Sequence, residues 1–277
     1  MNYCFMNFPK FRRKAVTLSY DDGVKDDKRL IEIMDKYGLK GTFNINSGLF
    51  AKDENSGRLT ERAAYDLYVN SGHEVAVHGV RHLSLGEVPA EAGLYDIIND
   101  RRTLEKMFDR QIRGMAYANG SVGEYAESIL ALSGIRYSRT TRATEKFDIP
   151  SNWLKLDPTC HHNHPRLMEL AKEFVEYQQR AYTPGRRCLL FYLWGHSYEF
   201  PRDKNWNVIE EFASYVGGRE DEIWYATNIE IYNYVKAFER LEWFADMSGA
   251  YNPSAIDVFV EIDNKQFEIK SGETVKF

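Results

Sequence analysis

The chain has 277 residues, of which 43% are hydrophobic and 28% charged, so it is long enough for one or two globular domains of ordinary composition. Its formal net charge of -5 provides no basic surface for nucleic acid, and no apolar run reaches the roughly 18 residues of a membrane span. The cysteines, Cys4, Cys160 and Cys188, are too few and too widely spaced for a disulfide framework or a CxxC zinc site, and they predict reduced thiols.

Strands and helices are expected to alternate along most of the chain. Short apolar runs predict strands at residues 14–20, 41–46, 74–77, 112–117, 135–138, 188–194 and 223–226. Helical spacing of apolar residues predicts helices at residues 26–37, 59–69, 90–108, 124–132, 166–180, 207–215 and 229–244. The sixth of these strands is apolar throughout, as is typical of a strand that is buried on both faces.

Repeated β-α units indicate a parallel sheet, and they predict an α/β fold, a distorted (β/α) barrel of about seven parallel strands. Residues 256–262 and 266–269 alternate in polarity like a hairpin. We therefore expect a barrel domain over residues 1–250 and a small C-terminal β-hairpin extension over residues 251–277, packed on the same domain. The N-terminus lacks the apolar segment of a secretory signal, which predicts a cytoplasmic location unless a leader has been removed.

Polar residues that follow the predicted strands are the candidates for a site, because barrel enzymes carry their chemistry at the carboxyl ends of the strands. Asp21 and Asp22 follow the first strand, His78 and His82 the third, and His196 the sixth. A carboxylate and two imidazoles that leave one coordination position open to water are typical of a catalytic zinc site. Each motif also has a purely structural interpretation, since Asp-Asp-Gly is a common turn sequence.

These motifs resemble those of a known family. Residues 17–23, Thr-Leu-Ser-Tyr-Asp-Asp-Gly, resemble the T-F-D-D-G motif of the polysaccharide deacetylases, the NodB-homology group that includes carbohydrate esterase family 4. Residues 78–82, His-Gly-Val-Arg-His, resemble the H-S/T-x-x-H motif of that family, and residues 193–196, Leu-Trp-Gly-His, match its late L-x-x-H motif. The resemblance covers roughly residues 14–244. It implies a distorted (β/α) barrel and metal-dependent removal of N- or O-acetyl groups from sugars.

The resemblance implies a role for each matching residue. Asp22, His78 and His82 would bind a divalent metal, most often Zn2+, with Co2+ or Mn2+ as alternatives. Asp21 would be the general base that takes a proton from the attacking water, and His196 would be the general acid that protonates the departing amine. An amide nitrogen is a poor leaving group until it gains a proton, so an acid is needed as well as a base.

Two motifs of the family are altered in this sequence. The third, R-x-P-Y/F, has Ala116 where the Arg that holds the base would stand, and its Pro and aromatic residue are missing. Arg113 and Arg139 are the candidates to replace that Arg; we favour Arg139, which follows a predicted strand, with an ordinary ion pair as the alternative. The backbone N–H of Asn119 is expected to help bind the oxyanion. The D-x-x-D-W motif, which tunes the acid, is missing apart from Trp153.

Residues around the predicted acid are expected to contact the substrate. Trp194, Tyr198 and Glu199 flank His196, and packing in the barrel floor is the alternative for the aromatic residues. The histidine-rich residues 157–164 predict a polar loop, or side chains that contact the substrate or surround the metal ligands. The expected partner is an acetylated carbohydrate, with no nucleic acid and no membrane span, and the sequence does not predict an oligomeric state. Hydrolysis of another non-peptide C–N amide bond and a catalytically silent carbohydrate-binding homologue are the alternative functions.

Overall fold

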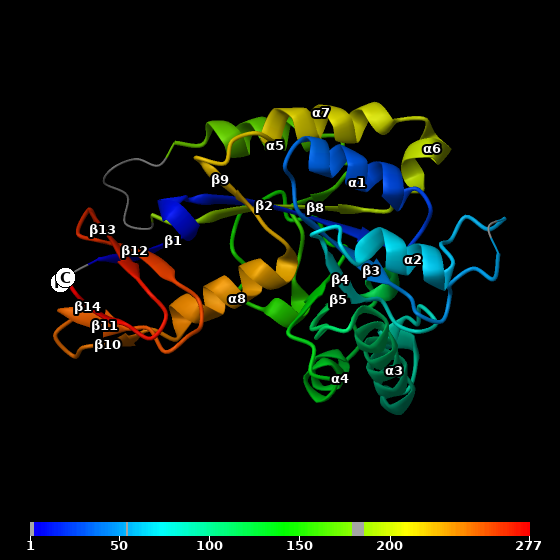
Figure 1. Ribbon diagram of the computed structural model, residues 1–277, viewed down its shortest axis with the longest axis horizontal. Coiled ribbons are helices and arrows are strands. Elements are labelled where there is room, and N and C mark those ends of the chain that lie inside the picture. The colour runs from blue at the N-terminus through cyan, green and yellow to red at the C-terminus, as the bar shows by residue number, and fades with distance from the viewer. Residues whose placement is uncertain (1–2, 54, 179–185) are drawn as a thin grey trace.

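A curled parallel sheet is the centre of the computed structural model, which describes residues 3–53, 55–178 and 186–277 (Figure 1). The strands are β1 (Cys4–Asn7), β2 (Lys14–Asp21), β3 (Gly41–Ile45), β4 (Glu74–Val77), β5 (Gly114–Ala116), β6 (Tyr137–Arg139), β7 (Cys160–His161), β8 (Leu189–Gly195), β9 (Ile223–Tyr225), β10 (Glu242–Trp243), β11 (Gly249–Tyr251), β12 (Val258–Ile262), β13 (Lys265–Ile269) and β14 (Thr274–Lys276). The helices are α1 (Asp27–Lys36), α2 (Glu61–Tyr68), α3 (Ala90–Phe108), α4 (Ala126–Leu132), α5 (Leu167–Glu176), α6 (Glu199–Asp203), α7 (Trp206–Val216) and α8 (Asn228–Glu239).

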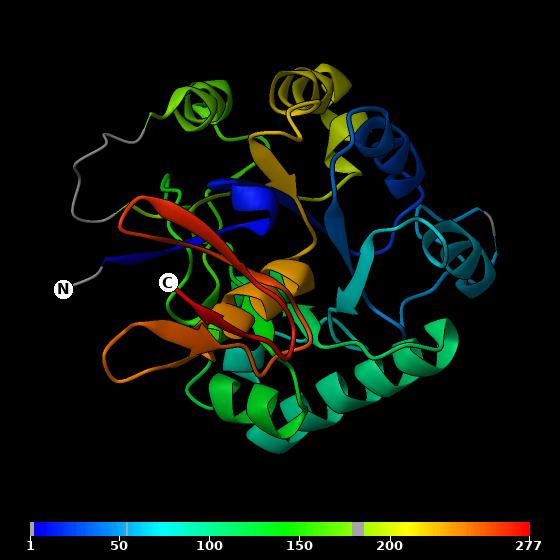
Figure 2. The same cartoon turned by 60° about the vertical axis from the view of Figure 1, so that its left-hand side comes forward.

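The central sheet has eight strands in the order β6-β5-β4-β3-β2-β8-β7, and β9 pairs with the beginning of β2. All of these pairs are parallel. Helices α1, α5 and α7 lie on one side of the sheet, while α3 and α4 lie on another (Figures 1 and 2). The predicted α/β fold, a distorted barrel of parallel strands, is confirmed.

Successive side chains of β2 face opposite sides of the sheet, as in any strand. Val16 and Leu18 pack in the apolar core beneath the outer helices, whereas Ala15 packs in a second core inside the curl. This alternation places Asp21, the last residue of β2, on the same inner face as Ala15. The register of one buried strand therefore directs a carboxylate into the barrel.

Helix α8 closes one end of the barrel. Tyr234 and Ile231 pack in the inner core with Leu190 of β8. At the beginning of α8, Asn228 accepts a hydrogen bond from the Thr17 hydroxyl at 2.9 Å. The inner core fills the end where the strands begin, so the polar inner residues gather where the strands end.

The stretch from Leu156 to His162 joins the two edges of the sheet. Its beginning is bonded to β6, since the Leu156 N–H donates to the Ser138 carbonyl at 2.9 Å. Its end is bonded to β8, since the Thr159 N–H donates to the Tyr192 carbonyl and the His162 N–H to the Trp194 carbonyl, both at 2.9 Å. The histidine-rich segment of the sequence therefore lies at the rim of the barrel and includes β7.

The C-terminal extension contains the predicted hairpin. Strands β12 and β13 pair antiparallel, and Asp263 and Asn264 form the turn with positive φ angles of 47° and 67°. Strand β1 from the N-terminus adds to this hairpin by pairing with β12, and β10, β11 and β14 form a further small sheet. Figure 2 shows these strands side by side near both termini. The division of the chain at residue 250 stays a prediction.

One predicted helix is wrong at its end. The sequence predicts a helix through residue 244, but α8 ends at Glu239 and residues 242–243 form β10, which pairs with β11. The apolar spacing fits a helix. However, the partner strand β11 comes later in the chain, and only the tertiary structure places it beside residues 242–243. Helix α5 ends at Glu176, and the last two residues of the helix predicted at 166–180 lie outside the described residues.

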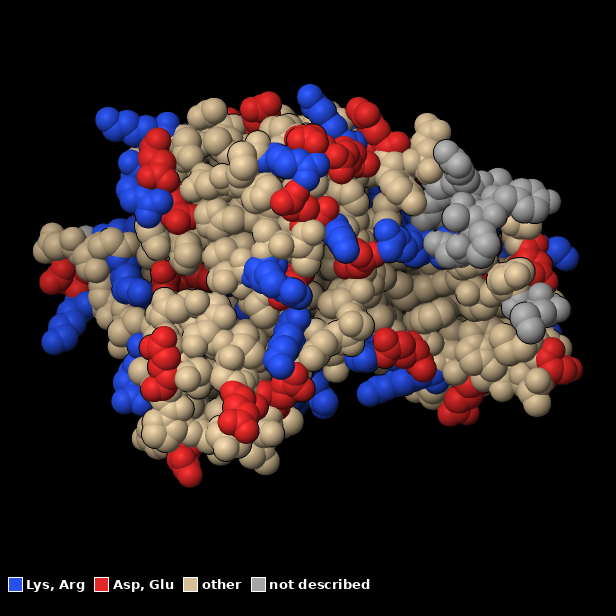
Figure 3. All heavy atoms as spheres, turned by 180° about the vertical axis from the view of Figure 1, so that it is seen from behind, with Lys and Arg blue, Asp and Glu red and all other residues tan. Residues whose placement is uncertain are grey.

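The surface carries charges of both signs. On the face drawn in Figure 3, the Lys and Arg side chains alternate with Asp and Glu over the described residues. Within the described part of the chain, the helices include none with the length and apolar character that a membrane span requires.

Candidate active site

Two adjacent carboxylates stand at the end of β2. Asp21 completes the strand and is only 2% exposed. Asp22 follows with a φ of 86°, a backbone conformation that is uncommon for a residue other than glycine, and its N–H donates to the Asn44 carbonyl at 2.9 Å. The turn separates the two carboxylates, so that each faces a different histidine.

Asp22, His78 and His82 form the first cluster of possible metal ligands. His78 directly follows β4, and His82 follows four residues later with a φ of 58°. Ligand atoms of the three side chains lie within 4.8 Å of one another, and His82 Nε2 is 3.8 Å from Asp22 Oδ1. Carboxylate oxygens and imidazole nitrogens are the ligands that Zn2+ takes in catalytic sites. The structure thus brings together the residues that the sequence predicted to meet.

The proton position on His78 fits a metal ligand. Its Nδ1 lies 2.9 Å from the Ala116 carbonyl oxygen, which can only accept a hydrogen bond, so Nδ1 carries the proton. Its Nε2 is buried and has no hydrogen-bond partner among the described residues. Burial lowers the pKa of His78, against the opposing effect of Asp21 and Asp22. A neutral imidazole with a buried, unpartnered lone pair is what a divalent cation requires.

Arg139 and Asn44 hold Asp21. The fully buried Arg139, at the end of β6, forms an ion pair with Asp21 Oδ2, and the Asn44 amide donates to Asp21 Oδ1 at 2.8 Å. Burial alone would raise the pKa of Asp21, but the positive charge of Arg139 and the neighbouring histidines outweigh it, and the pKa lies below its ordinary value. Arg113, the other candidate, precedes β5 and donates to the Gly134 carbonyl at 3.0 Å. It therefore lies where the parallel strands begin, whereas Arg139 lies where they end.

His196 completes the group. It directly follows β8, and its Nε2 lies 3.9 Å from Asp21 Oδ2. Burial would lower the pKa of His196, but Glu199, Asp21 and Asp22 outweigh it, so the pKa is raised. A raised pKa favours the protonated imidazole, which is the form that a general acid needs.

The predicted substrate residues occupy different environments. Trp194 is 8% exposed and lies beneath the Arg139 guanidinium, whose carbon is 4.4 Å from the ring centroid. Tyr198 is half-buried, with its ring 5.1 Å from that of His196. Asn119 is exposed after β5, and its amide donates to the Ser84 hydroxyl at 3.0 Å. A substrate role for these residues stays a prediction, and Trp194 occupies the buried position that the alternative expected.

Trp153 lies away from these residues. It packs in the inner core near α8, with its ring 5.2 Å from that of Tyr232. It therefore does not contact His196 in the way that the missing D-x-x-D-W motif would require.

Three residues that contact the metal-ligand cluster were missed from the sequence. Arg58 donates to the Asp22 carbonyl at 2.6 Å and lies 3.3 Å from its Oδ1. Asn46 donates to the His78 carbonyl at 2.7 Å. Asp100 of α3 is fully buried and accepts hydrogen bonds from the Ser47 N–H at 2.7 Å and the His78 N–H at 3.0 Å. A carboxylate on the apolar face of a helix was the available signal for Asp100.

The Asp100→Asn variant is expected to bind the metal about 10- to 100-fold more weakly, the usual effect of losing a residue that orients a ligand. The amide keeps only one acceptor, so one of the two backbone N–H groups, at Ser47 or at His78, faces an NH2 group. Chelator competition measures the affinity. Glu91→Gln, on the exposed side of the same helix, is the control. Equal affinities in the two variants would show that Asp100 has no part in positioning His78.

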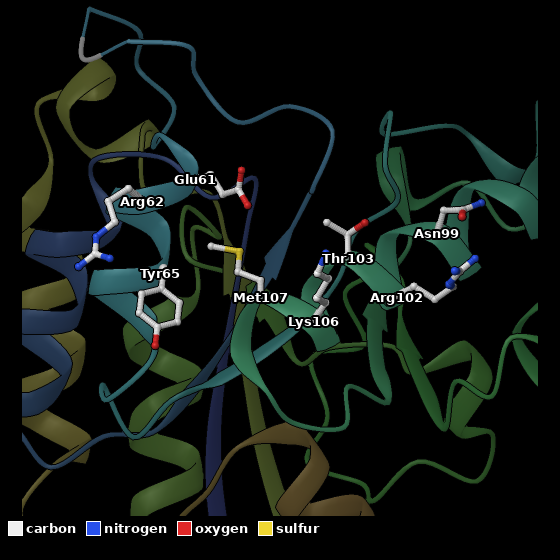
Figure 4. A pocket seen from close by; sticks show the side chains of 8 residues that line it. All are labelled: Glu61, Arg62, Tyr65, Asn99, Arg102, Thr103, Lys106 and Met107. Carbon is white, nitrogen blue, oxygen red and sulfur yellow. The ribbon is translucent and has the colours of Figure 1, made fainter.

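A large hollow lies away from these residues. It measures about 930 Å³ and lies between α2 and α3 (Figure 4). Its lining consists of Glu61, Arg62, Tyr65, Asn99, Arg102, Thr103, Lys106 and Met107. None of the candidate site residues is among them, so side-chain chemistry rather than surface shape identifies the site.

Comparison with known proteins agrees with the motifs. Residues 9–138 match the family model described as polysaccharide deacetylase. No curated protein matches the sequence. The matched segment contains Asp21, Asp22, His78 and His82 but ends before Arg139 and His196.

Solved structures with TM-scores above 0.5 share the fold. A Mycobacterium smegmatis protein assigned as a polysaccharide deacetylase has a TM-score of 0.59 at 15% identity, over 84% of this chain and 93% of that chain. The Xyl-CE4 domain of a multidomain xylanase from the hindgut metagenome of Trinervitermes trinervoides has a TM-score of 0.53 at 10% identity, over 82% and 92%. The Streptococcus pyogenes deacetylase PplD in complex with acetate matches over 50% of this chain and 61% of its own length, with 20% identity and a TM-score of 0.45. The chain thus covers less than two thirds of that last protein.

Proposed function

We propose that this chain, whose residues 9–138 match the polysaccharide deacetylase family model, is a metal-dependent hydrolase that removes an acetyl group from a sugar. The observation that supports the proposal most strongly is the meeting of Asp21, Asp22, His78, His82 and His196 at the ends of β2, β4 and β8. These residues are far apart in the sequence. Their convergence beside a buried arginine is difficult to explain by folding stability alone, since burying charges is costly.

Asp22, His78 and His82 are the residues that would hold a divalent metal, with Zn2+ as the first choice and Co2+ or Mn2+ as alternatives. A metal there would lower the pKa of a water molecule and polarise the acyl oxygen. Arg58 and Asn46 keep the ligand-bearing segments in place through their hydrogen bonds to Asp22 and to the His78 carbonyl. The identity of the metal and the substrate are part of the proposal.

Asp21 is the proposed base that accepts a proton from the attacking water. Its lowered pKa keeps the carboxylate ionised at neutral pH. Arg139 and Asn44 each bond one oxygen of this carboxylate, and so fix its direction. We assign to Arg139 the role of holding the base, which the family gives to the arginine of its third motif and which Ala116 cannot perform.

His196 is the proposed acid. Its Nε2 faces the Asp21 side of the site, so a scissile bond between the two residues would have a base on one side and an acid on the other. When the C–N bond breaks, the His196 proton moves to the departing nitrogen and the ring becomes neutral. The raised pKa of His196 favours the charged form that this step needs.

The His196→Ala variant is expected to lose about 10²- to 10⁴-fold in kcat on an N-acetyl sugar, the usual contribution of a general acid. Its rate on an activated acetate ester should fall far less, because a good leaving group needs no proton. Parallel assays of acetate release and of leaving-group absorbance measure the two rates. An equal loss on both substrates would remove His196 from the role of acid.

The overall proposal is tested by loading metal-free protein with Zn2+, Co2+ or Mn2+ and measuring acetate release from a panel of acetylated mono- and oligosaccharides. We expect one equivalent of metal and metal-dependent release. Uptake of metal with hydrolysis only of other amides would favour the alternative C–N hydrolase. A protein that takes up no metal and releases no acetate would be the silent homologue.

A further inference from the structure

A second group of titratable side chains surrounds Glu199, the first residue of α6. Its Oε2 lies 3.0 Å from His161 Nε2, 3.2 Å from His162 Nε2 and 3.7 Å from His196 Nδ1. His161 ends β7, and His162 follows it at the rim of the barrel. Three imidazoles from two separate segments therefore face one carboxylate oxygen.

This group has two possible interpretations. Ligand atoms of His161, His196 and Glu199 lie within 4.8 Å of one another, a spacing that a second metal ion could use. Alternatively, the imidazoles direct N–H groups at the carboxylate. The two interpretations require opposite proton positions on His161, because a neutral imidazole has one N–H donor and one acceptor nitrogen.

The backbone decides the proton position on His161. The Asn163 N–H donates to His161 Nδ1 at 3.1 Å, so Nδ1 is the acceptor and the proton is on Nε2, the atom that faces Glu199. His78 shows the reverse arrangement, with its proton on Nδ1 and its Nε2 lone pair unpartnered. His78 therefore presents a lone pair to the Asp22 cluster, whereas His161 presents an N–H toward Glu199 Oε2 at 3.0 Å. Among the described residues, Glu199 Oε2, His162 Nε2 and His196 Nδ1 are buried without a hydrogen-bond partner of suitable angle, so these groups face one another as charges and dipoles.

His162 is fixed by its surroundings. It is fully buried, and its ring lies 4.2 Å from that of Phe200 and 5.7 Å from that of Tyr20. A Cβ atom at Gly195 would come within 2.0 Å of His162 Nδ1, so the glycine before His196 makes room for this ring. Burial lowers the pKa of His162 to about 4, which leaves it neutral near pH 7.

Glu199 is ionised in this environment. Burial alone would raise the pKa of its carboxyl, but His161, His162 and His196 outweigh burial and hold the pKa well below its usual value. The charged and titratable groups around His196 are Glu199 of α6, Asp21 and Asp22 after β2, the Tyr198 ring at 5.1 Å and the His161 ring at 6.4 Å, with His162 beyond them. Their combined effect favours the charged form of His196.

We propose that Glu199 is a positioning residue that orients the His196 ring for proton donation, and that His161 and His162 hold Glu199 in place. This inference rests on the proposed deacetylase function. Glu199 lies on the Nδ1 side of the His196 ring, so the proton that the ring can transfer is the one on Nε2, 3.9 Å from Asp21 Oδ2. The Nδ1 contact of 3.7 Å is longer than a hydrogen bond, and catalytic contacts of this kind shorten when substrate binds.

Glu199→Gln is the variant that tests this role, with Glu211→Gln on the exposed face of α7 as the control. The amide cannot balance the positive charge of His196. We expect kcat on an N-acetyl sugar to fall at least about tenfold, part of the 10²- to 10⁴-fold contribution of an acid, with little change in KM. The rate on an activated ester should hardly change. The basic limb of the pH profile should move to lower pH, because His196 then loses its proton more easily.

Three results would overturn the proposal. An unchanged kcat and pH profile would mean that Glu199 does not act on His196, and an equal loss on amide and ester would indicate a purely structural role. A second equivalent of Zn2+, bound by the wild-type protein and lost in Glu199→Gln, would assign the cluster to a metal.

A readout independent of activity separates this inference from the proposed function. Imidazole ¹⁵N NMR of the metal-free protein should show His161 with its proton on Nε2, and a proton on Nδ1 would overturn the inference. Failure of the wild-type protein to hydrolyse any acetylated sugar would reject the proposed function, while the NMR result would still decide how His161 and Glu199 are arranged.

Discussion

The Asp21→Asn variant should bind metal as the wild-type protein does and yet lose about 10²- to 10⁴-fold in kcat, the range expected for removal of a general base. Asparagine has nearly the same shape as aspartate, but its amide cannot take a proton from water. The ligand atoms of Asp22, His78 and His82 are left in place by this change. Metal stoichiometry and acetate release, measured on the same sample, separate binding from turnover.

The control for this variant is Asp66→Asn, at an exposed carboxylate on α2. Full activity in Asp21→Asn would remove Asp21 from the role of base. The wild-type pH profile gives a second check, because a base works only when ionised and is lost as the pH falls through its pKa. Since Arg139 and the neighbouring histidines hold the pKa of Asp21 below its ordinary value, the acid limb should lie below the usual range of an aspartate.

The His78→Ala variant is expected to abolish both metal binding and turnover. Loss of a residue that only orients a ligand costs about 10- to 100-fold in metal affinity, and loss of a ligand itself should cost more. His78 is also the buried member of its cluster, so no surface residue can readily replace its nitrogen. Chelator competition measures the affinity, and acetate release measures the turnover.

His73→Asn is the matched control, because His73 precedes the same strand, β4, at the end where that strand begins. The Asn side-chain oxygen can accept the Gly41 N–H in place of His73 Nδ1. We expect metal binding and turnover close to wild type in this control. Wild-type metal affinity in His78→Ala would mean that the metal, if bound, is bound elsewhere.

Much of the barrel could be predicted because its signals are local. The alternation of short apolar runs with helical spacing predicted the strands that became β2 to β6, β8 and β9, and the rule that barrel sites lie at strand ends selected His78 and His196. Strand β7 and the joining of the sheet edges through residues 156–162 could not be predicted. Their hydrogen bonds go to β6 and β8, and these two strands come close to residues 156–162 only when the sheet curls closed.

The candidate site was predicted unevenly for the same reason. Arg139 was favoured because it follows a strand, and the structure places it against Asp21. Asp100 was missed because its partners, the Ser47 and His78 N–H groups, belong to loops that approach α3 only in the folded chain. Glu199 was expected to contact substrate, whereas in the structure it faces three imidazoles.

The sequence by itself determined the parallel α/β architecture and the chemical types available at the strand ends, because side-chain periodicity and residue type are properties of the chain. Tertiary structure decided which of these groups meet and where their protons lie. A carbonyl oxygen at Ala116 holds the proton of His78 on Nδ1 and leaves a lone pair on Nε2, whereas a backbone N–H at Asn163 leaves the proton of His161 on Nε2. Both partners are main-chain atoms, which every residue carries, so only the folded geometry distinguishes the two histidines.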